Sequence, residues 1–322
     1  MQNNTIRFIP FLLLCLIFII SGCSNSNEAQ GSEEKQNNKD KDTTADVREY
    51  ESLNGTIELP ANPERVLVAV QDYVGDVLAL GVEPVGVAGW ISETSPYHKD
   101  LIKGIENVGE NREVDVEKAM SLNPDVILTY DPNMYDKLSK IAPTVVIPLD
   151  YGYHDRITEI GKVLNKQEEA NKWIKTFESK AEEKKQALID ANKGDIKVAI
   201  VELSAKDIYL MGKTFGRGGQ IIYELLELEA PKPVEEEAFK KGWASISEEM
   251  IPEILGEADH ILLGVRGDAE KMESTITESS LWKRLPAVQS GNVHPYSVDA
   301  LYYSDAIALE HQLDQITAMF LK

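Results

Sequence analysis

The feature that most constrains the fold is a highly charged run at residues 166–192, near the middle of the 322-residue chain. Within it Trp173, Phe177 and Ala181 recur every fourth residue, and Glu and Lys fill many of the other positions. This spacing places the apolar residues on one face of an α-helix. At about 1.5 Å per residue the helix would be roughly 40 Å long, about the width of a domain. It is either a surface helix of one domain or a rigid connection between two, and we favour the connection.

Short apolar runs alternate with helical patterns on both sides of this helix. Strands are expected at residues 65–70, 84–88, 125–130 and 144–148 before it, and at 197–203, 260–265 and 293–296 after it. Strands separated by helices are typical of doubly wound parallel sheets. The sequence therefore predicts an α/β fold with two doubly wound lobes, each with a parallel central sheet, joined by one long rigid helix.

This pattern divides the chain into five parts. They are a leader at residues 1–22, a tether at 23–47, an N-terminal lobe at 48–164, a connecting helix at 165–193 and a C-terminal lobe at 194–322. In open α/β sheets, ligands bind beyond the carboxyl ends of the strands. Two lobes that face each other would therefore offer one ligand cleft between them.

The N-terminus has the features of an export signal. Arg7 precedes an apolar run at residues 8–20, which is short for a membrane span and typical of a secretory leader. Ile20-Ser21-Gly22-Cys23 resembles a bacterial lipobox, in which Cys23 becomes the lipidated first residue of the mature chain. The alternative is an ordinary signal peptide that ends near a cysteine. A lipid on Cys23 would hold the protein on the extracellular face of the cell membrane.

Composition excludes several functional classes. The formal charge of −21 disfavours nucleic acid as a partner, because phosphate recognition needs a basic face. The five histidines are scattered without paired spacing, which disfavours a zinc site. The only cysteine besides Cys23 is Cys15, which lies in the leader, so a disulfide is not expected in the mature chain. We therefore expect no metal ligands in the protein.

Motifs for catalysis are also missing. Gly212-Lys213-Thr214 lacks the upstream glycine of a phosphate-binding loop, because position 207 is aspartate. His294, Ser297 and Asp299 are close in sequence, but no nucleophile elbow surrounds them. The sequence therefore predicts a protein that is not an enzyme, with an exported hydrolase as the alternative.

The most informative loop contains Phe215 and Arg217 among glycines, after an expected strand and before a helix at Gln220. An aromatic side chain beside an arginine suits a flat ligand or an anionic oxygen. The alternative is a helix-start turn with Arg217 in a surface ion pair. Other aromatic residues follow expected strands or precede the last helix, and we expect the ligand to contact them: Tyr73, Trp90, Tyr130, Tyr209, Tyr302 and Tyr303.

Four stretches carry a family resemblance: VEKAMSLNPDVILTY at residues 116–130, MGKTFGRGGQIIYELL at 211–226, GWASISEEM at 242–250 and LYYSDAIALEHQLDQI at 301–316. With them the chain from about residue 48 onward resembles the iron–siderophore substrate-binding lipoproteins of bacterial ABC importers, in particular the hydroxamate-binding branch. That branch has Trp-Gly-Arg-Gly and Trp-Tyr-x-Asp-Pro. Here Phe215 and Tyr302 replace the tryptophans and Ala306 replaces the proline, so the identity of the ligand stays open.

The resemblance implies roles for individual residues. Arg217 would donate hydrogen bonds to the iron-bound hydroxamate oxygens, and Tyr209, Phe215 and Tyr302 would wall the ligand. Glu117 and Glu249 would each pair with an arginine of the permease dimer, with Glu248 as the alternative to Glu249. The protein would be a monomer without a cofactor, and iron would be bound only through the siderophore. Vitamin B12 or haem is the alternative ligand on the same fold.

The net charge favours a ligand of low charge. Loss of residues 1–22 removes only Arg7 among the charged residues, so the formal net charge changes from −21 to −22. A ferric tris-hydroxamate is neutral, whereas a ferric tris-catecholate is a trianion that needs several converging cations. The expected cleft loops offer Lys213, Arg217 and Arg266, which can act over a Debye length of about 8 Å. Because the connecting helix is stiff, we also expect a preformed cleft and little lobe movement on binding.

Overall fold

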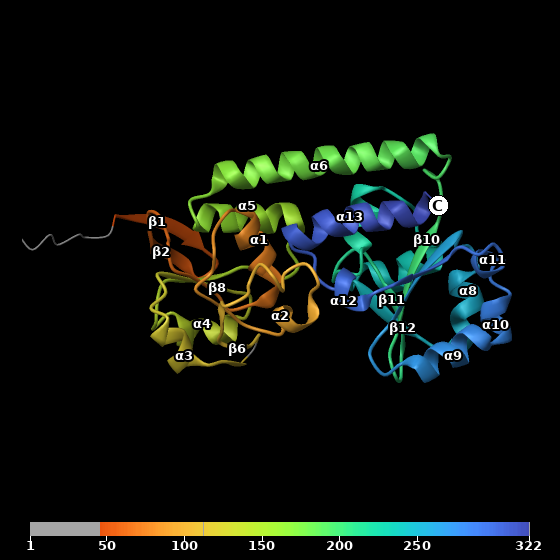
Figure 1. The fold of residues 1–322 in the computed structure, drawn as a ribbon, viewed down its shortest axis with the longest axis horizontal. Helices are drawn as coiled ribbons and strands as arrows, with labels where there is room; N and C mark the ends of the chain where they lie inside the picture. Colours follow the sequence, from red (N-terminus) through yellow and green to blue (C-terminus); the bar gives the residue numbers. More distant parts are fainter. Residues whose placement is uncertain (1–45, 112, 322) are drawn as a thin grey trace, which may run out of the picture. The chain divides into compact units, whose positions relative to one another are not determined.

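The computed structural model describes residues 46–111 and 113–321, which belong to one compact unit (Figure 1). The expected leader, the lipidation site Cys23 and nearly all of the expected tether lie outside the described residues. Within the described ranges, no helix has both the length and the apolar character needed to cross a membrane.

The N-terminal lobe is built on a five-stranded sheet in which every pair of neighbours is parallel. Its strands, in spatial order, are β5 (Glu106–Asn107), β4 (Gly86–Val87), β3 (Val66–Val68), β8 (Val126–Thr129) and β9 (Thr144–Val146). Every residue of β3, β8 and β9 is buried, as expected for parallel strands covered on both faces. Two antiparallel hairpins that the sequence pattern did not predict flank this sheet: β1 (Val47–Ser52) with β2 (Gly55–Pro60), and β6 (Gly109–Glu110) with β7 (Glu113–Val114).

Short helices connect these strands. They are η1 (Gln71–Tyr73), α1 (Val74–Ala79), α2 (Ile91–Thr94), α3 (Val116–Ser121), α4 (Pro132–Leu138) and α5 (Tyr153–Val163). The carboxylate of Asp115 caps α3 by accepting from the amide of Lys118, and that of Asp131 caps α4 by accepting from the amide of Asn133. Capping aspartates fix where helices begin after strands in both cases.

The C-terminal lobe has a mixed sheet in the order β12 (Trp243–Ile246), β11 (Ile208–Met211), β10 (Val198–Leu203), β13 (His260–Val265) and β14 (Val293–Tyr296). The parallel pairing of β10, β13 and β14 was expected. The antiparallel strands β11 and β12 were not. β11 follows β10 through a tight turn in which the Ser204 hydroxyl accepts from the Asp207 amide at 3.0 Å, so a hairpin replaces a helical crossover.

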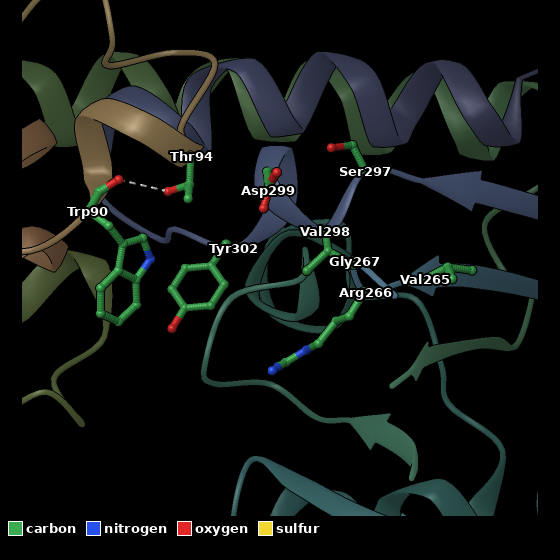
Figure 2. Close-up of a pocket in the computed structure, with 9 residues that line it drawn as sticks. All are labelled: Trp90, Thr94, Val265, Arg266, Gly267, Ser297, Val298, Asp299 and Tyr302. Carbon is green, nitrogen blue, oxygen red and sulfur yellow. Dashed lines mark hydrogen bonds between the residues drawn. The ribbon is translucent and has the colours of Figure 1, made fainter. Parts of the chain in front are cut away.

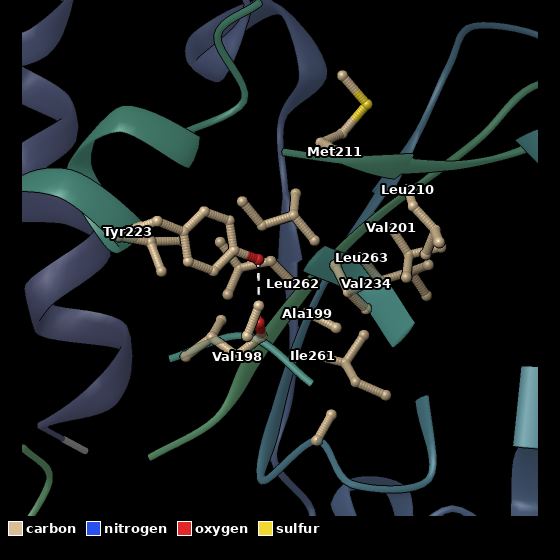
Figure 3. Packing of buried hydrophobic residues seen from close by; sticks show 14 of the residues in the cluster. Val198, Ala199, Val201, Leu210, Met211, Tyr223, Val234, Ile261, Leu262 and Leu263 are labelled. Atoms are coloured by element: carbon tan, nitrogen blue, oxygen red, sulfur yellow. Dashed lines mark hydrogen bonds between the residues drawn. The ribbon is translucent and has the colours of Figure 1, made fainter. Parts of the chain in front are cut away.

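The remaining elements of this lobe are short: η2 (Ile221–Leu225), α7 (Lys232–Val234), η3 (Glu235–Phe239), η4 (Glu248–Met250), α8 (Ile251–Leu255), α9 (Glu270–Glu278), α10 (Ser280–Lys283), α11 (Pro286–Gln289) and α12 (Val298–Leu301). They cover a core of branched aliphatic side chains on the central strands, including Val201 and Leu263 (Figure 3). The hydroxyl of Tyr223 reaches through this core and donates to the Val198 carbonyl at 2.9 Å. The buried phenol hydroxyl therefore has a hydrogen-bond partner.

The long helix is present as α6 (Gln167–Asp190) and runs past both lobes (Figure 1). Its buried face is divided between two cores. Ala170 and Ile174 pack in the core of the N-terminal lobe, and Phe177, Ala181 and Leu188 pack in the core of the C-terminal lobe. The helix therefore connects the lobes through its packing, as the sequence pattern predicted.

A second helix also joins the lobes, which the sequence pattern did not predict. The last helix, α13 (Ala306–Phe320), begins with Ala306 and Ala308 in the N-terminal core and continues into the C-terminal core from Leu309 onward. On its exposed side Asp314 pairs with Lys180 and Lys184 of α6, at 2.7 and 2.8 Å. Two parallel connections resist bending of one lobe against the other more strongly than one.

A set of buried charged residues, which we call the junction cluster, holds the start of α13 in the N-terminal lobe. Its members are Asp76, His98, Arg156 and Asp305. Arg156 Nε lies 2.6 Å from Asp76 Oδ2, and a terminal amino group of Arg156 donates to the Ser304 carbonyl at 2.6 Å. His98 Nε2 lies 3.0 Å from Asp305 Oδ1, and Asp76 Oδ1 accepts from the Ala306 amide at 2.9 Å.

Candidate ligand-binding cleft

A continuous cleft lies where loops from both lobes meet. One hollow of about 520 Å³ is lined by Asp72, Trp90, Tyr130 and Leu149 of the N-terminal lobe together with residues of the C-terminal lobe. A hollow of about 430 Å³ extends from it toward Arg266 and α12 (Figure 2). A smaller one of about 240 Å³ continues toward β11 and β12. Because neighbouring hollows share lining residues, we treat them as one cleft.

Large apolar side chains face solvent in this cleft. Trp90, Leu149, Phe215 and Trp243 are 38%, 40%, 55% and 45% exposed. Trp90 and Leu149 belong to the N-terminal lobe, and Phe215 and Trp243 to the C-terminal lobe. Apolar side chains that gather in a hollow and stay exposed mark a surface that a ligand covers.

The loop that carries Phe215 and Arg217 has an uncommon backbone. Four successive residues, Phe215 to Gly218, have positive φ angles of 66°, 74°, 57° and 80°. Gly216 is required because a Cβ there would lie 2.0 Å from the Tyr302 carbonyl oxygen. Non-glycine residues in this conformation each cost about 1–2 kcal/mol. The strain is held by packing, including a hydrogen bond from the Arg217 amide to the Leu301 carbonyl.

Arg217 belongs to a second set of charged residues, the cleft cluster, with Glu202 and Arg266. Glu202 is fully buried in β10, and its Oε2 accepts from Arg217 Nε at 2.8 Å. Its Oε1 accepts from Arg266 Nε. The Arg217 guanidinium stacks over the ring of Tyr302 at 4.3 Å, and that of Arg266 lies 5.8 Å from the ring of Tyr209. Arg217 therefore forms a buried ion pair at the cleft, in place of the surface pair of the alternative interpretation.

The ion pairs favour the charged forms of Glu202 and Arg217. Burial alone would raise the pKa of Glu202, but hydrogen bonds and charges from Arg217 and Arg266 outweigh it and hold that pKa below its usual value. Burial likewise opposes the charge on Arg217, but Glu202 raises the pKa of its guanidinium. Since Arg266 uses Nε for Glu202, its terminal amino groups point toward Tyr302 and the cleft (Figure 2).

Among the residues that the structure describes, several on the N-terminal side of the cleft are acidic. Asp72, Glu110 and Glu113 line its largest hollow. Burial raises the pKa of Asp72 to about 6, and the nearby carboxylates of Asp305 and Asp76 act in the same direction while Arg156 opposes them. The guanidiniums of the cleft cluster thus face an acidic wall on the other lobe.

Six of the eight expected ligand contacts come together in the cleft. They are Trp90, Tyr130, Tyr209, Phe215, Arg217 and Tyr302. Two do not. Tyr73 is fully buried and its hydroxyl donates to the Ile147 carbonyl at 2.6 Å, while Tyr303 is 1% exposed and its hydroxyl lies 2.9 Å from Thr94 Oγ1.

These two positions differ from the expectation that Tyr73 and Tyr303 contact the ligand. Tyr73 lies in a turn that directs its ring inward, onto the segment that follows β9. Tyr303 is buried in the N-terminal core, and its ring contacts that of Tyr302 edge to face at 5.0 Å. Both support the cleft from beneath and do not line it.

Other lining residues were not named as contacts from the sequence. Trp243 begins an edge strand and forms an edge-to-face pair with Tyr209 at 5.6 Å. Leu149 follows β9 much as Tyr130 follows β8, so its place after a strand was an available signal. Glu202 was visible as a single acidic residue in the apolar strand VAIVEL. A lone acid in a buried strand indicates a partner that only the fold identifies.

The expected docking acids occupy equivalent positions on the two lobes. Glu117 and Glu249 are both exposed, and each lies two residues after the N-cap of a helix, Asp115 in one case and Ser247 in the other. Glu248 is half-buried and lies one residue earlier. By position Glu249 is the counterpart of Glu117.

No catalytic centre is formed by the residues considered from the sequence. The Ser297 hydroxyl caps α12, while His294 Nε2 lies 2.8 Å from His260 Nδ1, so these two serve separate contacts. Ser95, His98 and Asp305 are joined by hydrogen bonds of 2.6 and 3.0 Å, but all three are at most 2% exposed and no substrate can reach them. Among the described residues, no group of three or more His, Cys, Asp or Glu could hold a metal ion.

Known proteins are similar to this chain over all or nearly all of its length. The iron(3+)-hydroxamate-binding protein FhuD of Bacillus subtilis (strain 168) is 35% identical over 320 residues, which cover 97% of this chain and 96% of that protein. The iron(3+)-hydroxamate-binding protein YxeB of the same organism is 31% identical over 328 residues, covering 100% and 98%. Both names describe binding proteins, in agreement with the expectation that the chain is not an enzyme.

The fold is shared as well. A crystal structure of a FhuD fold-family protein from Bacillus subtilis, described as the periplasmic binding protein component of a ferrichrome ABC transporter, matches with a TM-score of 0.75. It is 34% identical, and the match covers 85% of this chain and 100% of that one. The family model for periplasmic binding proteins matches residues 66–297. On this sequence and fold evidence, the chain belongs to the periplasmic binding protein family.

Proposed function

We propose that this protein captures a ferric siderophore of the hydroxamate type outside the cell and delivers it to an ABC importer. The observation that carries the proposal is the pairing of the cleft cluster with exposed aromatic side chains from both lobes. Arginine N–H groups suit the iron-bound oxygens of a hydroxamate, and the aromatic rings suit its apolar arms. The names of the FhuD and YxeB relatives support the same ligand class.

In this proposal the siderophore carries the iron and the protein contacts only the organic shell. Arg217 and Arg266 donate to the oxygens, and Trp90, Phe215 and Tyr302 contact the carbon skeleton. A neutral ferric tris-hydroxamate needs no further cations, which fits the acidic wall opposite the arginines. The protein acts as a monomer, and a lipid on Cys23 keeps it at the outer face of the membrane.

Tryptophan fluorescence tests ligand capture. Trp90 and Trp243 line the cleft, whereas Trp282 is 3% exposed in the C-terminal core and Trp173 donates to Glu310 on α13. Ferric hydroxamates at micromolar concentration should quench the emission. The double variant Trp90→Phe with Trp243→Phe should lose most of the quenching, while Trp173→Phe should retain it.

The same titration can refute the proposal. If no ferric hydroxamate quenches the wild-type protein, the proposed ligand class is wrong. Tighter binding of cobalamin or haem, seen as a shift in the visible spectrum, would replace it with that ligand. Turnover of generic ester or phosphate substrates would indicate a hydrolase.

Docking to the permease is the second part of the proposal. Glu117→Ala combined with Glu249→Ala should leave siderophore affinity unchanged and abolish uptake by cells, because both side chains lie outside the cleft. Glu248→Ala is the matched control and should transport normally. Loss of siderophore affinity in the double variant would contradict the assigned roles.

A further inference from the structure

The cleft cluster contains one feature that ligand capture alone does not require. Glu202 is an acidic residue with 0% exposure, placed directly behind the two arginines that face the ligand. A buried carboxylate is costly unless it is paired, and here both of its oxygens are used by guanidiniums. The Tyr296 hydroxyl also approaches Glu202 Oε2, at 3.5 Å.

The two ion pairs share one feature, the use of the arginine Nε–H. Each arginine gives its Nε–H to a different oxygen of Glu202, so each guanidinium keeps terminal amino groups for other contacts. The terminal amino groups of Arg217 donate to Glu202 Oε1 at 3.4 Å and to the Phe215 carbonyl at 3.0 Å. The Arg266 side chain is 46% exposed and directs its terminal groups toward Tyr302 (Figure 2).

The charges of the cluster do not cancel. Two guanidiniums and one carboxylate leave one positive charge at the surface that meets the ligand. Among the other ionisable residues that the structure describes in the cleft, little positive charge is added, since Asp72, Glu110, Glu113 and Asp299 line it and Arg156 is paired with Asp76. Of the residues that the structure describes there, a polyanionic ligand would meet one uncompensated positive charge and several carboxylates.

We propose that Glu202 is a specificity-determining residue that sets the cleft cluster to a single positive charge and so selects ferric complexes of low charge over polyanionic ones. The inference rests on the proposed function, because it concerns which ferric siderophores that cleft admits. Glu202 acts through the arginines: it fixes their Nε atoms and cancels one of their two charges.

Two ligands of similar size but different charge test this role. They are a neutral ferric tris-hydroxamate and a trianionic ferric tris-catecholate, each titrated against wild type and Glu202→Gln. Glutamine keeps the size and one acceptor but removes the charge, so the cluster changes from +1 to +2. The ratio of the two affinities should shift toward the trianion by about tenfold or more, where tenfold corresponds to about 1.4 kcal/mol.

A compensating variant separates charge from geometry. Glu202→Gln combined with Arg266→Gln returns the cluster to +1, and its affinity ratio should return to near the wild-type value. Arg266→Gln alone keeps the Glu202–Arg217 pair and lowers the cluster to zero, so it should discriminate more strongly against the trianion. Lys271→Gln on α9 removes an exposed positive charge outside the cleft and should leave the ratio unchanged.

The outcomes are distinguishable. If Glu202→Gln weakens both ligands by the same factor, Glu202 only positions the arginines and the selectivity proposal is overturned. If the double variant has the same ratio of ligand affinities as Glu202→Gln alone, the charge of the cluster is not the cause of the selectivity. Thermal melting shows whether each variant folds. If Glu202→Gln does not fold, the ratio of the two ligand affinities measured for Arg266→Gln decides whether the charge of the cluster sets selectivity. Failure of the wild type to bind either complex would refute the proposed function itself.

Discussion

The junction cluster and the cleft cluster use the same chemistry for different purposes. In the junction cluster, Arg156 is 3% exposed, and its guanidinium donates to Asp76 and to the Ser304 carbonyl, both inside the protein. In the cleft cluster, Glu202 accepts the Nε–H of each arginine, and Arg266, whose side chain is 46% exposed, keeps its terminal groups directed toward the cleft. A buried ion pair whose partners lie within the protein stabilises the fold. An ion pair that leaves N–H groups directed toward a cleft can donate them to a ligand.

The comparison predicts the largest effect for Arg156→Ala. Removing this guanidinium leaves Asp76 buried without its main partner, and breaking a buried pair in this way costs about 3–5 kcal/mol of stability. The loss should appear in urea denaturation, while siderophore affinity per folded molecule stays near wild type. Arg156→Lys keeps the charge and should lose less. A loss below about 1 kcal/mol, the value of an exposed pair, would show that the junction cluster does not hold the lobes.

Arg217→Ala should give the opposite pattern. Siderophore affinity should fall by about 1.5–3 kcal/mol, the range for a hydrogen bond to a charged group. Stability should fall much less than in Arg156→Ala, because Glu202 keeps its pair with Arg266. Isothermal titration and thermal melting measure the two effects on one sample. If stability falls more than affinity, the distinction between the clusters is lost.

The dependence of stability on pH sharpens the comparison on the cleft side. The pKa of Glu202 is lowered in the folded protein, so its ionised form stabilises the fold above its unfolded pKa, and this contribution is lost as pH falls through the folded pKa. The stability difference between wild type and Glu202→Gln should therefore be constant from about pH 8 to 5 and shrink below about pH 4.5. A difference that shrinks already between pH 7 and 5 would contradict the ion pairs.

The smallest expected effect is the change in shape on ligand binding. Because α6 and α13 both pack into the two cores, the lobes should move little, and small-angle scattering with and without a ferric hydroxamate should give nearly the same radius of gyration. Arg156→Ala, which loosens the start of α13, should increase the difference. A large compaction of the wild-type protein would show that the two helices do not fix the lobes.

Much of the fold followed from periodicity because its elements have strong local signals. The four-residue spacing of Trp173, Phe177 and Ala181 located α6, and the apolar runs located β3, β8, β10 and β13. β11 and β12 were missed because β11 is a short strand inside an expected loop and β12 alternates between exposed and buried residues. β12 is also the edge strand of its sheet, and a strand with one side toward solvent carries little hydrophobic signal.

The cleft was predictable in part. Phe215, Arg217 and Tyr302 stood out because glycines and turn residues surround them. The direction of a side chain in a turn depends on the tertiary fold, so Tyr73 and Tyr303 were indistinguishable from Trp90 and Tyr302 in sequence. Glu202 could not be paired with Arg266, because the two meet only through the parallel register of β10 and β13.

The divided face of α6 has a consequence for how the protein unfolds. Ala170 and Ile174 belong to one core, and Phe177, Ala181 and Leu188 belong to the other. If either lobe melted first, half of the helix would lose its apolar partners, and a helix segment that short is only marginally stable alone in water. Melting of one lobe therefore weakens the other, and the two cores should denature as a single cooperative unit, with one calorimetric transition.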